Sequence, residues 1–88
     1  KLVIGFSAET ENLLQNSKKK LKIKNADWII ANDVSKKDIG FNKDFNEVTI
    51  IQSDGKISQI KKNKKSFIAT VISEKIIKEL LVNDKTLN

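Results

Sequence analysis

Two short apolar stretches, each followed by a polar segment, constrain the fold of this chain more than any other feature. Residues 2–6 are almost continuously apolar and are followed by the polar residues 7–10. After a helical stretch the pattern is repeated by the apolar residues 28–31 and the polar segment 32–35. Such strands are typical of a sheet covered on both faces. A strand, a helix and a strand form a βαβ unit, and ligands bind outside the carboxyl ends of its strands. We therefore expect both polar segments, and the chemistry, on one rim.

The helix between these strands carries signals at both ends. Ser7 or Thr10 can cap its start, and Glu9 and Glu11 would place negative charge in the first turn, where the helix dipole favours it. Lysines crowd the last turns, where positive charge is favoured. Asn25 is predicted to be a left-handed C-cap.

The second half of the chain predicts a β-hairpin. Residues 47–52 are rich in Val, Thr and Ile and predict a strand, and residues 53–56 (Ser-Asp-Gly-Lys) carry the Asp-Gly turn signal. Residues 57–60 form the return strand. We expect residues 61–65 to be a solvated linker.

The last element is predicted to be a helix, because apolar residues recur with the helical period between Ile68 and Leu81. We expect it to end at Asn83. Residues 1–83 would form an incomplete domain, and residues 84–88 a frayed tail. The order β-α-β, β-hairpin, α predicts an α/β fold, the second half of a three-layer domain, with the hairpin projecting from the sheet or extending it.

Length and composition limit the classes of protein that fit. With 88 residues beginning at Lys1, the chain is expected to be a piece of a longer protein whose sheet starts upstream. It has no Cys and no His, which removes disulfides, the commonest metal ligands and Cys or His nucleophiles. With no apolar run long enough to span a membrane and no signal peptide pattern, we expect a cytoplasmic protein with no membrane partner.

The positive charge comes from one residue type. The net charge is +6, and all 17 basic residues are lysine. The absence of Arg argues against bidentate forks to base edges or phosphates, although Lys is a good point-charge ligand for phosphate. Lysines in residues 61–65 have no aromatic residues between them, so a solvated segment is favoured over a nucleic-acid interface.

Lys20 and Lys24 are candidate ligand-binding residues. They are four residues apart and share one face if the helix persists that far. No acidic partner stands at matching spacing, so two clustered ammonium groups suit an anion such as a triphosphate. Spacing alone favours the plainer interpretation, a solvated helix end whose charge compensates the dipole.

Three further residues lie at the predicted rim. Phe6 ends the first apolar stretch, where it could stack on a nucleobase; its residue type alone favours a core phenylalanine. Asn32 and Asp33 could orient a ligand, and Asp33 could help to hold a magnesium ion. Both could equally be turn residues whose side chains bond their own backbone.

Taken together, these segments resemble the C-terminal part of bacterial phosphopantothenate–cysteine ligase. The specific parts are residues 5–10 (Gly-Phe-Ser-Ala-Glu-Thr) and residues 31–34 (Ala-Asn-Asp-Val). Lys20 to Lys24, Gly40-Phe41 and Asn46-Glu47-Val48 follow the same order and spacing, whereas the final helix matches only in pattern.

The resemblance implies a reaction in coenzyme A biosynthesis. The ligase activates the carboxylate of 4′-phosphopantothenate with CTP, forming an acyl-cytidylate and pyrophosphate; the amine of cysteine then attacks and CMP leaves. It also implies a Rossmann-like α/β domain that forms homo-oligomers. The ligase is usually fused behind a flavin-dependent phosphopantothenoylcysteine decarboxylase, a lyase, so FMN is expected only if that domain precedes this chain.

The resemblance also implies roles for particular residues. The aromatic residue after the strand glycine and two lysines near the following helix end contact CTP, and they correspond to Phe6, Lys20 and Lys24. Mg²⁺ is expected to share the triphosphate. No catalytic residue and no metal ligand are assigned within the chain.

Other parts of the family's site lie upstream of the matching segment. They are a lysine-rich loop, the phosphopantothenate-binding asparagine, much of the cytidine pocket and the dimer contacts. We therefore expect the chain to need the N-terminal part of the same domain as its partner and to be inactive alone. A preference for CTP over ATP stays open. A basic nucleic-acid-binding module and a non-catalytic nucleotide-binding module are the alternative functions.

Overall fold

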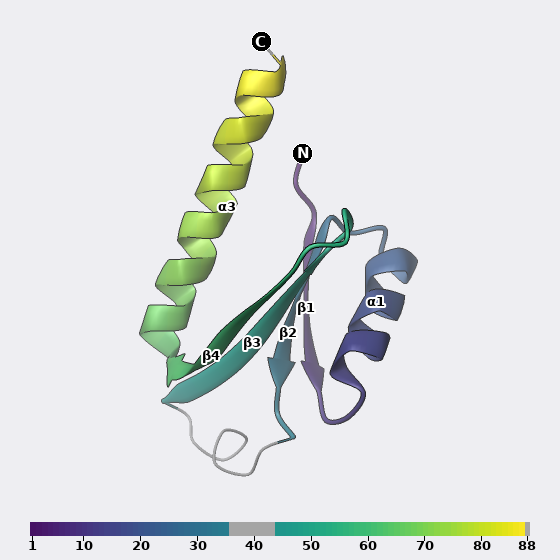
Figure 1. Cartoon of the computed structure of the whole chain (residues 1–88), viewed down its shortest axis with the longest axis vertical. Coiled ribbons are helices and arrows are strands. Elements are labelled where there is room, and N and C mark those ends of the chain that lie inside the picture. The colour runs from purple at the N-terminus through teal and green to yellow at the C-terminus, as the bar shows by residue number, and fades with distance from the viewer. Residues whose placement is uncertain (36–43, 88) are drawn as a thin grey trace.

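The described part of the chain folds as a mixed four-stranded sheet between two helices. The computed structural model describes residues 1–35 and 44–87. In chain order the elements are β1 (Ile4–Glu9), α1 (Leu13–Ile23), β2 (Trp28–Asp33), β3 (Phe45–Gln52), β4 (Ile57–Lys64) and α3 (Lys65–Leu87). The strands lie in the order β1-β2-β3-β4; β1 is parallel to β2, and the other neighbours are antiparallel. Figure 1 shows α1 and α3 on opposite sides of the sheet. The predicted α/β class and element order are confirmed.

Alternation along β2 builds a core on each face of the sheet, because successive side chains point to opposite faces. Ile29 and Ala31 pack with Ile51 on the side of α1, where Leu13 and Leu21 join them. The core on the side of α3 consists of Trp28, Ile30, Val48, Ile50, Ile60 and Ile68. Both faces of β2 are therefore covered, as its apolar sequence predicts.

The hairpin joins the sheet as its outer half. Gly55 takes the positive φ of 96° that the Asp-Gly turn requires, and its N–H donates to the carbonyl of Gln52 at 3.0 Å. The prediction of a linker at residues 61–65 is wrong. β4 continues to Lys64, which pairs with Phe45 beyond an irregularity in the β3–β4 register. Lysines suit an exposed edge strand, so this sequence does not distinguish the strand from a linker.

Helix α1 starts later than its sequence signals suggest. Its N-cap is Asn12, with φ of 47° and no side-chain cap, and there is no acidic residue in its first turn. Ser7 and Glu9 lie in β1 instead, because the strand continues beyond its apolar part. The predicted left-handed conformation of Asn25 is confirmed by its φ of 50°.

Helix α3 extends farther than expected. It packs on the sheet through Ile68, Val71, Ile72 and Ile76, and it continues past Asn83 to Leu87. Within the described residues, no helix is both long enough and apolar enough to cross a membrane.

Candidate functional site

The carboxyl ends of β1 and β2 meet at one rim, as the βαβ pattern predicts. Ala8 lies opposite Asn32, and Glu9 lies opposite Asp33, in the parallel register. The N–H of Val34 donates to the carbonyl of Glu9 at 3.0 Å and extends the pairing past the strand. Two segments far apart in the sequence therefore place their polar side chains together.

Phe6 and Asn32 lie on the α3 side of this rim. Together with Asn46, Lys65 and the apolar residues of α3, they line an open groove of about 260 Å³. Phe6 is 62% exposed, so the interpretation of this residue as part of the core is wrong. An exposed aromatic ring beside carboxamide groups can stack on a planar ligand while the amides bond to its edge.

The amide of Asn32 is fixed by hydrogen bonds on both sides. Its Nδ2 donates to the carbonyl of Ser7 at 3.3 Å, and its Oδ1 accepts from Nδ2 of Asn46 at 2.6 Å. Asn32 thus ties β2 to both neighbouring strands. Asn46 is a groove residue that was not assigned a role from the sequence; only its place in the family resemblance pointed to it.

Asp33 behaves as a turn residue, one of the two alternatives left open by the sequence. Its Oδ1 accepts hydrogen bonds from the backbone N–H of Ser35 at 3.0 Å and from the Ser35 hydroxyl at 2.5 Å. In the parts of the chain that the structure describes, no three Asp, Glu, His or Cys side chains gather as metal ligands.

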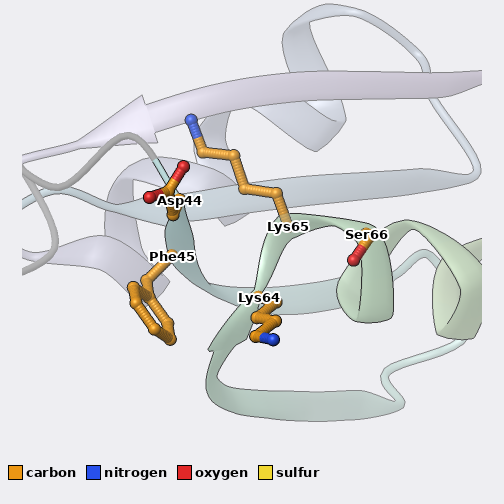
Figure 2. A pocket seen from close by; sticks show the side chains of 5 residues that line it. All are labelled: Asp44, Phe45, Lys64, Lys65 and Ser66. Atoms are coloured by element: carbon orange, nitrogen blue, oxygen red, sulfur yellow. The ribbon is translucent and has the colours of Figure 1, made fainter.

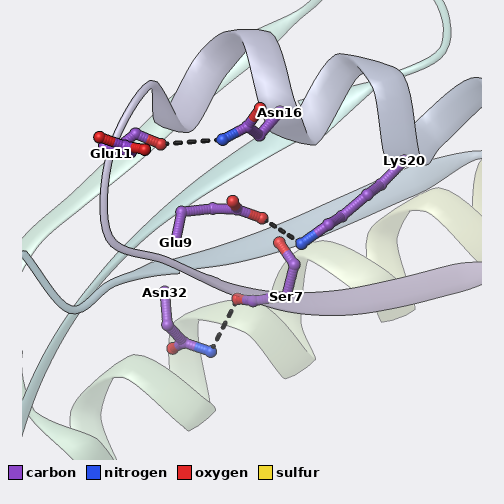
Figure 3. A network of polar contacts seen from close by, with 6 residues as sticks. All are labelled: Ser7, Glu9, Glu11, Asn16, Lys20 and Asn32. Atoms are coloured by element: carbon purple, nitrogen blue, oxygen red, sulfur yellow. Dashed lines mark hydrogen bonds and ion pairs between the residues drawn. The ribbon is translucent and has the colours of Figure 1, made fainter.

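Lys20 lies on the opposite face, the side of α1, and it has an acidic partner. Its Nζ donates to Oε2 of Glu9 at 2.5 Å (Figure 3). No acidic residue stands at helical spacing from Lys20, as the sequence shows, but the fold supplies a partner from β1. Helical spacing reveals partners within a helix, whereas Glu9 comes from the neighbouring strand.

The pair controls the ionisation of Glu9. The hydrogen bond from Lys20 lowers the pKa of the Glu9 carboxyl below its ordinary value and outweighs burial, which acts in the opposite direction. Smaller contributions in the same direction come from Ser7 and Asn16. Glu9 is therefore a buried carboxylate that stays charged at neutral pH.

Lys24 lies one helical turn beyond Lys20 and is exposed. Its Cδ would lie 3.6 Å from a Cβ added at Gly5, so its side chain also runs beside β1. Both candidate lysines thus flank the strand from which Phe6 projects on the other face. The structure brings Phe6 and Asn32 into one groove and separates them from the lysines by the sheet.

A larger hollow lies elsewhere, where β3 begins and β4 passes into α3. Asp44, Phe45, Lys64, Lys65 and Ser66 line its volume of about 520 Å³ (Figure 2). None of the five residues predicted to bind ligand lines it. The candidate site is therefore identified by its position at the rim of β1 and β2 and not by the size of the hollow.

This arrangement is that of an α/β protein whose candidate site lies at the ends of its parallel strands. A family model described as "DNA/pantothenate metabolism flavoprotein C-terminal domain" matches residues 1–80. The chain belongs to this family.

Individual relatives agree with this assignment. The chain is 46% identical over 54 residues to the coenzyme A biosynthesis bifunctional protein CoaBC of Bacillus subtilis (strain 168), covering 61% of this chain and 13% of that protein. It is 42% identical over 72 residues to CoaBC of Borreliella burgdorferi, covering 81% of this chain and 17% of that protein. It is 34% identical over 76 residues to a cysteine/cysteine sulfinic acid decarboxylase of an unknown prokaryotic organism, covering 86% of this chain and 21% of that protein.

A solved structure shares the fold. The crystal structure of the C-terminal domain of CoaBC superposes with a TM-score of 0.71 at 34% identity, over 96% of this chain and 36% of the solved chain. The chain thus spans about a third of that domain structure and a fifth or less of the Bacillus and Borreliella proteins.

Proposed function

We propose that this chain is the C-terminal part of a CTP-dependent ligase that joins 4′-phosphopantothenate to cysteine in coenzyme A biosynthesis. The observation that carries the proposal is the match of the family model to residues 1–80. The aromatic residue and both lysines that the family resemblance implicates are present, and all lie on or beside β1. Fold alone would not support an activity, since one fold serves many functions.

The proposed reaction has two steps. A carboxylate oxygen of 4′-phosphopantothenate bonds to the α-phosphorus of CTP, and the bond from that phosphorus to the bridging oxygen breaks, releasing pyrophosphate. The amine of cysteine then attacks the acyl carbon, loses a proton and displaces CMP. Negative charge grows on the departing pyrophosphate, and ammonium groups fixed nearby stabilise it. We assign that role to Lys20 and Lys24, and contact with the base to Phe6.

Other components follow from the same proposal. Mg²⁺ would be carried by the triphosphate, because Mg²⁺ binds readily to substrate phosphates while keeping several of its waters. FMN would belong to a fused decarboxylase domain. The 88-residue chain alone is proposed to lack turnover, and the complete enzyme to be a homo-oligomer. Measurable ligation by the purified 88-residue chain would contradict the first of these statements.

The test is ligation by the full-length protein with Mg²⁺ and either CTP or ATP. We expect CTP-dependent release of pyrophosphate that requires both 4′-phosphopantothenate and cysteine. Lys24→Gln should lower kcat/KM for CTP about tenfold, the effect of losing one charged hydrogen bond. Lys22→Gln is the matched control, because Lys22 is exposed on the same helix.

Two results would favour another function. CTP binding without turnover in the full-length protein would indicate a non-catalytic nucleotide-binding module. RNA binding that weakens steeply with salt, in a protein that ignores CTP, would indicate a nucleic-acid-binding module.

A further inference from the structure

Glu9 is a buried carboxylate at the end of the strand that carries the candidate site. It is 5% exposed, and its Oε2 accepts the hydrogen bond from Nζ of Lys20 at 2.5 Å (Figure 3). The side chain of Lys20 is 38% exposed. Lys20 therefore bridges a buried negative charge and the solvent.

The two partners differ in their freedom to move. The backbone of Glu9 is held in the parallel ladder opposite Asp33, so the carboxylate cannot follow a ligand into solvent. Departure of Lys20 would leave an ionised carboxylate buried without its cation, which is strongly unfavourable. An incoming anion thus meets Lys20 while the ammonium group is still bound to Glu9.

A lysine held in this way can still bind an anion. An ammonium group has three N–H donors, and Glu9 accepts from one of them. A side chain that is already ordered loses less conformational entropy when a ligand binds. Lys24 has no such restraint, since it is exposed and forms no ion pair with any side chain described in residues 1–35 and 44–82.

We infer that Glu9 is a positioning residue for the triphosphate: it anchors the ammonium group of Lys20 beside β1, from where Lys20 binds phosphate oxygens. This inference rests on the proposed function of Lys20. Glu9 acts through Lys20 and does not touch the nucleotide. A carboxylate near a polyanion ordinarily weakens binding by charge repulsion, so removing the charge of Glu9 would then strengthen CTP binding. If Glu9 anchors Lys20, removing its charge weakens CTP binding instead.

Kinetics of the full-length protein test the coupling. Glu9→Gln should lower kcat/KM for CTP about tenfold, mainly through KM. Lys20→Gln should lower it at least as much, and the double variant should be no worse than Lys20→Gln alone, because Glu9 acts only through Lys20. Glu11→Gln is the matched control, an exposed carboxylate two residues away, and should leave kcat/KM unchanged.

Additive losses in the double variant, or tighter CTP binding by Glu9→Gln, would overturn the inference. Thermal unfolding of each variant shows whether a loss of activity is a loss of fold. If the unaltered full-length protein does not turn over CTP, the proposed function fails, and the anchoring is decided separately by NMR.

NMR of the lysine side chains in the full-length protein supplies that decision without relying on turnover. The NζH₃⁺ resonance of Lys20 should be resolved in the unaltered chain, because its ion pair slows proton exchange. It should shift but persist when inorganic triphosphate is added, whereas the Glu9→Gln chain should lose it. A resonance that is absent from the start, does not respond to triphosphate or vanishes on its addition would contradict anchoring of an anion-binding lysine.

Discussion

At the residue scale, Gly5 shows how one position sets the approach of two strands. A Cβ added there would lie 2.9 Å from Cδ1 of Ile29, which is fully buried in the core on the α1 side. A methyl group must therefore push the side chain of Ile29 aside. Only glycine fits this position without such a shift.

We predict that Gly5→Ala destabilises the chain by about 1–2 kcal/mol, the usual cost of overpacking. Urea unfolding measures the change. Ile29→Val removes Cδ1 and should cost about 1 kcal/mol alone. The double variant should lose less free energy of unfolding than the two single variants together, because valine has no Cδ1 to clash with the added methyl group. Strict additivity would contradict this account of Gly5.

The candidate residues show how far sequence reasoning reaches at this scale. The family resemblance selected Phe6 and Lys20, but residue type suggested a buried position for Phe6, which is exposed, and helical spacing could not reveal that Lys20 pairs with Glu9. Both shortcomings have one cause. Exposure of a strand residue and a strand–helix ion pair depend on neighbours brought together by the fold, and no local pattern contains them.

At the element scale, the ion pair of Glu9 and Lys20 connects β1 to α1 and makes their packing depend on pH. Because the folded pKa of Glu9 is depressed, its stabilisation is present above the ordinary pKa of 4.5 and is lost as the pH falls through the lower folded value. We expect Glu9→Gln to destabilise at pH 7 by about 1–3 kcal/mol, the cost of an unmet charged partner.

The test is the free energy of unfolding of both proteins between pH 7 and pH 3. The difference should shrink below pH 4.5 as Glu9 becomes protonated in the unaltered chain. Ser7 and Asn16 also face this carboxyl and remain in both proteins. A difference that stays constant across this range would exclude the ion pair as its source.

Helix α3 is attached to the sheet through one of its faces. Ile68 is 3% exposed and belongs to the core, whereas Ile77 is 57% exposed. Ile68→Ala should therefore cost about 2–4 kcal/mol, and Ile77→Ala less than about 1 kcal/mol. Thermal or urea unfolding compares them. Equal effects would contradict the one-sided attachment.

Elements with a strong local pattern were predictable. The apolar run of β2, the Asp-Gly turn and the period of α3 each identify their element. The limits of β4 and α1 were not predictable. The end of β4 was missed because an edge strand of lysines resembles a linker. The start of α1 was missed because β1 continues through residues that also suit a helix cap. In both places, pairing with a neighbouring strand decides the structure.

At the scale of the whole molecule, the order of elements was enough to predict the layers. A βαβ unit followed by a hairpin and a helix leaves few ways to cover both sheet faces. The separation of Phe6 from Lys20 and Lys24 by the sheet was not predictable, because it depends on the register of β1. Odd and even positions of that strand face different layers.

The sheet is held together unequally. Within the described part of the chain, β2 and β3 have a strand on each side, whereas β1 pairs with β2 alone. We predict that, in the 88-residue chain alone, backbone amides of β1 exchange with deuterium faster than those of β2 and β3, because edge pairing opens at lower free energy. Hydrogen-exchange mass spectrometry measures this, and equal protection of all three strands would contradict it.

In the 88-residue chain alone, the strand that presents Phe6 and Glu9 is thus also expected to open early by local unfolding. A ligand that binds to β1 raises the free energy needed to open this strand before it affects the unfolding of the rest of the chain. Protection gained by β1 would then record occupancy of the site directly, even for a ligand that leaves the global unfolding temperature almost unchanged.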